Sequence, residues 1–78
     1  MTQDYELLEQ VVLLALLHKE PDESVQDILA MLEESRAMTT AEGKEIISNL
    51  EKEGAIVDGK LSFVGMALAN KAQEAFKL

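Results

Sequence analysis

The chain lacks cysteine and has one histidine, His18, among its 78 residues. Without cysteine there are no disulfides, which stabilise many small secreted domains. Cysteine-ligated zinc is excluded for the same reason, and a single histidine cannot build a histidine-rich metal site. We therefore expect no metal ion and no other cofactor.

Long apolar runs are also missing. The longest run, Val11–Leu17, has seven residues, whereas a membrane-spanning helix needs about 18 or more. No basic segment precedes this run, so we do not expect a signal peptide. These features predict a soluble, cytoplasmic protein that does not insert into membranes.

Basic residues are scarce. Seven lysines and arginines stand against fifteen aspartates and glutamates, which gives a net charge of −8. A field of this sign repels nucleic acids and anionic membranes at long range. The charge balance therefore favours a protein partner over DNA, although it leaves DNA binding as an alternative.

Signals of catalysis are absent as well. The chain has no glycine-rich phosphate-binding loop, and its four serines have only His18 as a partner for a nucleophile–base pair. A chain of this size also leaves little room for a substrate pocket of about 300 Å³ or more. We expect a protein without enzymatic activity and without a small-molecule substrate.

Apolar residues make up 47% of the chain, which is enough for one compact core. We predict a single domain over residues 1–78. Apolar spacing, together with helix start and stop signals, predicts four helices. They run from Gln3 or Asp4 to Lys19, from Ser24 to Glu34, from Thr40 to Glu53, and from Val64 to Lys77.

Two of these helices begin with a capping box, in which the cap residue and the third helical residue bond to each other's backbone amides. Ser24 with Asp27 and Thr39 with Glu42 have this spacing. Gly54 suits the left-handed position that follows a helix end. These signals set the expected bounds of the second and third helices.

A hairpin is predicted between the last two helices. Asp58-Gly59 separates two short apolar runs, which is the strongest local signal for a type I′ turn. A two-residue loop would pair Val57 with Lys60 and Ile56 with Leu61. Ile56, Leu61 and Phe63 would then share the buried face.

The expected core combines this face with the apolar stripes of the helices. Gly43 lies on the inner side of the third helix and suggests a close helix crossing there. The last helix is expected to use Val64, Leu68, Ala72, Ala75 and Phe76. The full set of predicted core residues is Leu8, Val11, Val12, Ala15, Val25, Ile28, Leu29, Leu32, Ile46, Ile47, Leu50, Ile56, Leu61, Phe63, Leu68 and Phe76.

The order helix, helix, turn, helix, hairpin, helix resembles that of winged helix-turn-helix domains, over nearly the whole chain. The most specific part is Ile47–Ile56, which contains the leucine-x-x-Glu-Gly-apolar pattern of many small winged-helix regulators, followed by the Asp58-Gly59 turn. Phe63-Val64-Gly65 stands where such regulators have a Thr-x-x-Gly helix start, but without the threonine. The resemblance implies a mainly α fold of four helices, with a two-stranded wing between the third and fourth.

The resemblance further implies that the third helix and the wing contact a partner. By this reasoning the contact residues for nucleic acid or protein are Arg36, Lys44, Ser48, Asn49, Lys52 and Lys60. In helix-turn-helix docking the preceding helix crosses the phosphates. Here that helix carries no lysine or arginine between Pro21 and Glu34.

Two hypotheses follow. The first is a non-catalytic interaction module that mediates protein association in gene regulation. The alternative is a small dimeric DNA-binding transcriptional regulator that uses the third helix and the wing. Acids interleaved among the basic residues would favour the first, and an acid-free basic face would favour the second.

Three leucines, Leu13, Leu16 and Leu17, lie opposite the main apolar stripe of the first helix. Two explanations stay open. The last helix folds back and covers them within one chain, or they form an oligomer interface together with Ala69. The second explanation would suit a homodimer or a heteromer.

Overall fold

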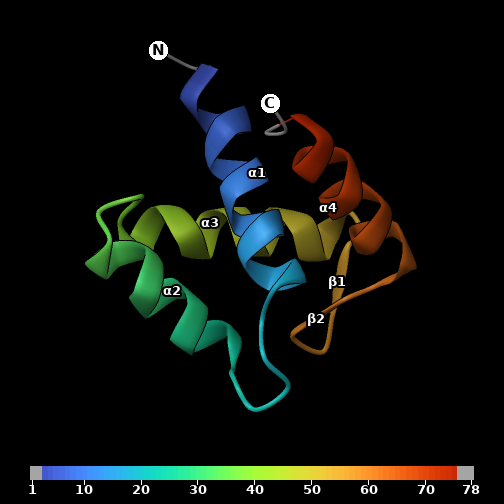
Figure 1. Cartoon of the computed structure of the whole chain (residues 1–78), viewed down its shortest axis with the longest axis horizontal. Helices are drawn as coiled ribbons and strands as arrows, with labels where there is room; N and C mark the ends of the chain where they lie inside the picture. The colour runs from blue at the N-terminus through green and yellow to red at the C-terminus, as the bar shows by residue number, and fades with distance from the viewer. Residues whose placement is uncertain (1–2, 76–78) are drawn as a thin grey trace.

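The computed structural model describes residues 3–75 and is mainly helical (Figure 1). A two-stranded antiparallel hairpin lies between the third and fourth helices, as predicted. This arrangement is compatible with a winged helix. The elements are α1 (Gln3–Leu17), α2 (Val25–Glu34), α3 (Thr40–Lys52), β1 (Ile56–Val57), β2 (Lys60–Leu61) and α4 (Phe63–Ala75).

Both predicted capping boxes are present. The Ser24 hydroxyl accepts a hydrogen bond from the Asp27 amide at 3.2 Å, and the Asp27 carboxylate accepts one from the Ser24 amide at 3.0 Å. Thr39 and Glu42 make the same pair of bonds at 3.1 and 2.9 Å. The starts of α2 and α3 are therefore encoded locally, by side chains within one turn of the helix.

The hairpin has the predicted register, with Ile56 opposite Leu61 and Val57 opposite Lys60. Asp58 and Gly59 have φ angles of 55° and 76°. A type I′ turn requires positive φ at both positions. Ile56 is buried and Val57 is exposed, so the predicted inner face of β1 is confirmed.

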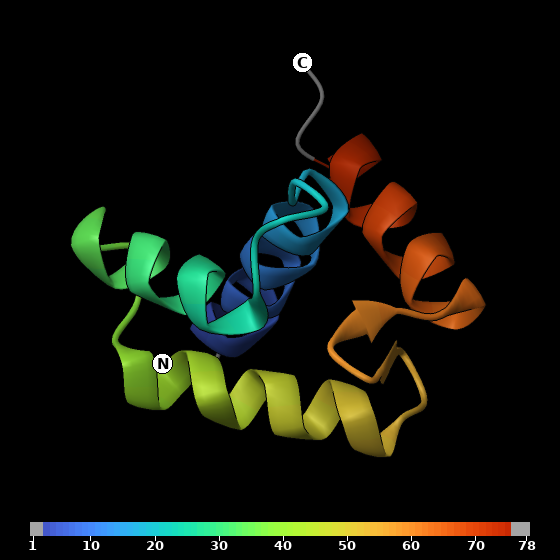
Figure 2. The same ribbon diagram turned by 90° about the horizontal axis from the view of Figure 1, so that it is seen from below.

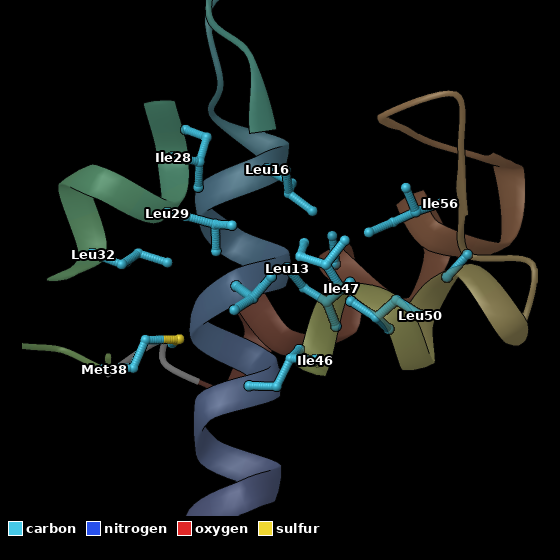
Figure 3. Close-up of a cluster of buried hydrophobic side chains, with 13 residues drawn as sticks. Leu13, Leu16, Ile28, Leu29, Leu32, Met38, Ile46, Ile47, Leu50 and Ile56 are labelled. Carbon is cyan, nitrogen blue, oxygen red and sulfur yellow. The ribbon is translucent and has the colours of Figure 1, made fainter. Parts of the chain in front are cut away.

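The core surrounds α1, which runs through the middle of the molecule (Figures 1 and 3). Side chains from α2, α3 and β1 point toward it from several sides. Eight of the predicted core residues are buried: Val12, Ile28, Leu29, Leu32, Ile46, Ile47, Leu50 and Ile56. Six others are half-buried and pack against them: Leu8, Val11, Ala15, Val25, Leu61 and Leu68. Phe76 lies outside the described residues.

The prediction that Phe63 belongs to the core is wrong, because its side chain is 90% exposed. The reason is that α4 begins at Phe63, so the strand alternation that would turn its side chain inward has already stopped. On a helix, Phe63 lies on the side opposite Ala72, which is buried. The inner face of α4 is Gly65, Leu68, Ala69 and Ala72, so Leu68 and Ala72 of the predicted stripe are confirmed, whereas Val64 and Ala75 are exposed.

Ser62 takes the place of the missing threonine at the start of α4. Its hydroxyl accepts a hydrogen bond from the Gly65 amide at 3.1 Å, and its carbonyl accepts one from the Met66 amide at 2.8 Å. These are the bonds of a helix N-cap. A Ser-x-x-Gly start therefore replaces the Thr-x-x-Gly start of the resembled regulators.

The leucines of α1 are covered within one chain. Leu13 is 4% exposed, Leu16 is 5% exposed and Ala69 is fully buried. Leu17 is half-buried and packs against the same core. Helix α4 lies alongside α1 (Figure 1). This burial supports the explanation in which the last helix covers the leucines within one chain, and an oligomer interface that includes Leu17 stays a prediction.

Two glycines permit close approaches between elements. A Cβ atom at Gly43 would overlap the end of the Leu29 side chain, so the close crossing expected at Gly43 is present, and the helix that crosses there is α2. A Cβ atom at Gly65 would overlap the Ala55 carbonyl oxygen, where α4 meets the segment before β1. Side chains at these positions would separate elements whose contact builds the core.

Helix α1 ends at Leu17, two residues before its predicted end at Lys19. The Lys19 ammonium donates to the Glu23 carbonyl at 2.9 Å and to the Glu20 carbonyl at 3.3 Å, in the loop that leads to α2.

Within the described residues, no helix has the length and hydrophobicity needed to cross a membrane.

Candidate interaction surface on α3 and the hairpin

Helix α3 lies along one border of the molecule with one long side uncovered (Figure 2). Thr39 is the N-cap of α3, and the buried residues of the helix are Gly43, Ile46, Ile47 and Leu50. The opposite side is therefore presented to solvent. Its exposed residues are Ala41, Lys44, Glu45, Ser48, Glu51 and Lys52.

A shallow groove of about 330 Å³ lies beside this uncovered side. It is formed by the start of α2, the middle of α3 and the turn of the hairpin. Its apolar lining comes from Val25, Leu29 and Ile47, and its polar lining from Gln26, Lys44, Ser48 and Glu51, with Gly59 at the hairpin turn. We call this region the α3 groove.

The α3 groove brings together two of the predicted contact residues, Lys44 and Ser48. Six of its residues were not predicted as contacts. Val25, Leu29 and Ile47 were assigned to the core, and Gln26, Glu51 and Gly59 were missed. The sequence could have indicated Gln26 as a contact residue, because it follows the cap of α2 on the outward face of that helix. Gly59 lies in the wing that the resemblance assigns to the contact surface, but only the tertiary structure brings this turn next to Val25 of α2.

Three other predicted residues are exposed but do not line the groove. Arg36 lies in the turn between α2 and α3, Lys52 is at the last position of α3, and Lys60 is on β2. Each is available to a partner that extends beyond the groove.

Asn49 is turned toward α1. Its amide nitrogen donates a hydrogen bond to the Tyr5 hydroxyl at 2.6 Å, and its side chain is half-buried. The amide therefore joins α1 to α3 and does not line the groove.

Acidic groups are interleaved with the basic ones. Glu51 lines the same groove as Lys44, and Glu45 is exposed next to Lys44 in the sequence. At the neighbouring start of α2, Asp22 and Asp27 are exposed. The lysines of α3 therefore do not form an acid-free basic face. Phosphate contacts need such a face.

The lining of the groove contains no histidine. Ser48 lies there without a histidine, because His18 lines a different groove between α1 and α2. The part of the chain that the structure describes contains no cluster of three or more acidic or histidine side chains suited to a metal ion. Apolar contact, hydrogen bonds and ion pairs are the interactions that this surface offers.

No protein-family model, curated protein or solved structure matches the chain.

Proposed function

We propose that the chain is a non-catalytic winged-helix module that binds a protein partner in gene regulation, through the α3 groove and the exposed residues around it. The observation that carries this proposal is the lining of the groove. An apolar floor from Val25, Leu29 and Ile47 is bordered by both a cation, Lys44, and an anion, Glu51.

This combination is typical of protein interfaces, where an apolar anchor enters a pocket and polar groups at the rim set orientation. A partner side chain that fills the floor would meet Gln26 and Ser48 as hydrogen-bonding groups. The net charge of −8 would steer association toward a partner with a basic surface.

The alternative is a small dimeric DNA-binding regulator. The uncovered side of α3 favours it, since a recognition helix must be free to enter the major groove (Figure 2). Four exposed cations are offered by Arg36, Lys44, Lys52 and Lys60. The carboxylates of Glu45 and Glu51 oppose it, because they lie among these cations.

The first experiment measures binding to a pool of random duplex DNA at about 50 mM and about 200 mM salt, where a protein with several phosphate contacts loses orders of magnitude in affinity. We expect no binding at either concentration. Binding that falls steeply with salt and is abolished by Lys44→Glu would overturn the protein hypothesis in favour of DNA.

The second experiment places a photo-crosslinking amino acid at Ser48 in the native cells. Gln73 is the control position, because it is also exposed but lies on α4. We expect protein adducts from Ser48 and not from Gln73, and we expect Lys44→Glu to remove them. Equal adducts from both positions, or adducts that survive Lys44→Glu, would contradict the proposal.

A further inference from the structure

A second groove, of about 450 Å³, lies between α1 and α2. It is distinct from the α3 groove, because Val25, Gln26 and Leu29 of α2 line one groove while Ile28 and Met31 line the other. We call it the α1–α2 groove. Its lining residues are Leu14, Ala15, His18, Glu20, Glu23, Ile28 and Met31.

The floor of the α1–α2 groove is apolar and incompletely used by the fold. Ile28 belongs to the core, and Ala15 packs against it. Leu14 is half-buried, and Met31 is 46% exposed. A methionine at such a site adapts its shape to different apolar partners. The groove therefore has two apolar side chains, Leu14 and Met31, that remain available for contact.

The loop between α1 and α2 places carboxylates beside this floor. Glu20 and Glu23 line the groove. The Glu23 carboxylate accepts a hydrogen bond from the Glu20 amide at 2.8 Å, which holds it in place. The cation nearest in sequence, Lys19, donates to the carbonyls of these two glutamates.

The outer side of α2 adds further acids. Asp27 and Glu34 are exposed, four residues before and three residues after Met31, so they flank it on the same helical face. The lining of the groove thus carries two carboxylates, on Glu20 and Glu23, together with the His18 imidazole. Asp27 and Glu34 add two exposed carboxylates on the outer side of α2 next to Met31. This charge selects a basic occupant.

We propose that the α1–α2 groove binds a basic amphipathic helix of a partner protein. Apolar residues one turn apart would contact Leu14 and Met31, and flanking lysines or arginines would face the carboxylates. A second copy of this chain is disfavoured because it carries the same charge of −8. The proposal does not depend on the α3 groove, so it holds even if the α3 groove binds no protein partner.

The test uses a synthetic helical peptide of leucine and lysine, with leucines at i, i+3, i+4 and i+7, and a scrambled peptide of the same composition. Fluorescence anisotropy measures affinity for the full chain at low and moderate salt. We expect the amphipathic peptide to bind about tenfold or more tighter than the scrambled one, which has the same charge.

Two matched pairs of variants locate the site. Met31→Gln removes an apolar contact without changing charge, and Met66→Gln is its control, because Met31 and Met66 are 46% and 48% exposed. Glu20→Gln and Glu45→Gln each remove one exposed carboxylate, the first in the groove and the second on α3. We expect only Met31→Gln and Glu20→Gln to weaken binding, the first by about tenfold and the second by a few-fold.

Circular dichroism and urea denaturation verify that all four variants remain folded. Equal binding of both peptides, or equal weakening by Met31→Gln and Met66→Gln, would overturn the proposal, since either result indicates general charge attraction. Self-association in analytical ultracentrifugation that Met31→Gln abolishes would also overturn it, because the groove would then hold a second copy of the chain.

Discussion

Helices α2 and α3 end in the same backbone motif, but with different residues at its left-handed position. At the end of α2, the Ala37 amide donates to the Leu32 carbonyl at 2.9 Å and the Arg36 amide donates to the Glu33 carbonyl at 3.0 Å. This pair of bonds is the Schellman motif. Its left-handed residue is Arg36, with φ of 65°.

At the end of α3, the Ala55 amide donates to the Leu50 carbonyl at 2.8 Å and the Gly54 amide donates to the Glu51 carbonyl at 3.0 Å. Here the left-handed residue is Gly54, with φ of 80°. The Gly54 carbonyl accepts a hydrogen bond from the Ser62 hydroxyl. The end of α3 is thereby joined directly to the start of α4.

The two ends differ in how strongly the tertiary structure holds them. Leu50 and Ala55 are fully buried, whereas Ala37 is exposed. A non-glycine residue in the left-handed region costs about 1–2 kcal/mol, which glycine avoids. The chain therefore uses glycine where the helix end belongs to the core. It tolerates the cost at the exposed end, where its one arginine, Arg36, is presented to solvent.

The largest effect is expected from truncating the leucine of each motif. Leu50→Ala should reduce the free energy of unfolding by about 2–5 kcal/mol. Leu32→Ala should reduce it less, because Leu50 also supports the segment that leads into the hairpin. Urea denaturation followed by far-UV circular dichroism measures both. Equal losses would show that the two helix ends are equally anchored. This result would contradict the statement that the tertiary structure holds the end of α3 more strongly.

Gly54→Arg should reduce the free energy of unfolding by about 1–2 kcal/mol, the cost of the left-handed conformation. No atom lies within 4 Å of a Cβ placed at Gly54, so no steric overlap adds to this cost. Gly54→Asn is the control and should lose less, because asparagine tolerates positive φ. A variant with arginine that unfolds at the wild-type urea concentration would contradict the explanation.

Arg36→Gly should raise the free energy of unfolding by up to about 1 kcal/mol, since relief of the left-handed cost exceeds the entropy that glycine loses on folding. Arg36→Ala keeps a Cβ atom and should give no such gain. Thermal denaturation of both variants compares them. A loss of stability in Arg36→Gly would mean that the arginine side chain makes a stabilising contact.

The smallest effect concerns charge at the end of α3, where Glu53 is the C-cap. Burial first, and then the carboxylates of Glu53 and Glu6, raise the pKa of Glu9. The folded chain therefore holds a proton on Glu9 more tightly than the unfolded chain does. As the pH rises from the usual glutamate range through this raised pKa, ionisation of Glu9 in the folded chain lowers the free energy of unfolding.

Glu53→Gln should lower the pKa of Glu9 and raise stability near neutral pH. The gain should shrink as the pH falls into the usual glutamate range, because Glu9 is then protonated in both states. The C-cap of α2 is the neutral Ser35, so Ser35→Ala should have an effect that does not vary with pH. NMR titration of Glu9 and melting curves across this range test both statements.

Local signals account for the parts of the fold that sequence reasoning predicted. A capping box or an Asp-Gly turn involves residues no more than three positions apart, so its geometry does not depend on distant elements. Ser24, Thr39 and Asp58 therefore marked their elements correctly. The exposure of Lys44 and Ser48 was also predictable, because the buried residues of α3 determine which side of that helix is exposed.

The errors occur where two periodicities meet. Phe63 fits the inner face of a strand that continues from β2, and it also fits the outer face of a helix that is capped by Ser62. The bond from the Gly65 amide to the Ser62 hydroxyl selects the helix. Gly65 itself is required because α4 packs against the Ala55 carbonyl, a contact that no local pattern reveals.

The starts of α2 and α3, the hairpin register and the exposed side of α3 are local properties, because each follows from hydrogen bonds or periodicity within a few residues. The packing of α4 on α1, the bond from Asn49 to Tyr5, and the grooves on both sides of α2 come from the assembly of distant elements. These features join residues far apart in the chain. Their geometry depends on how closely whole helices pack.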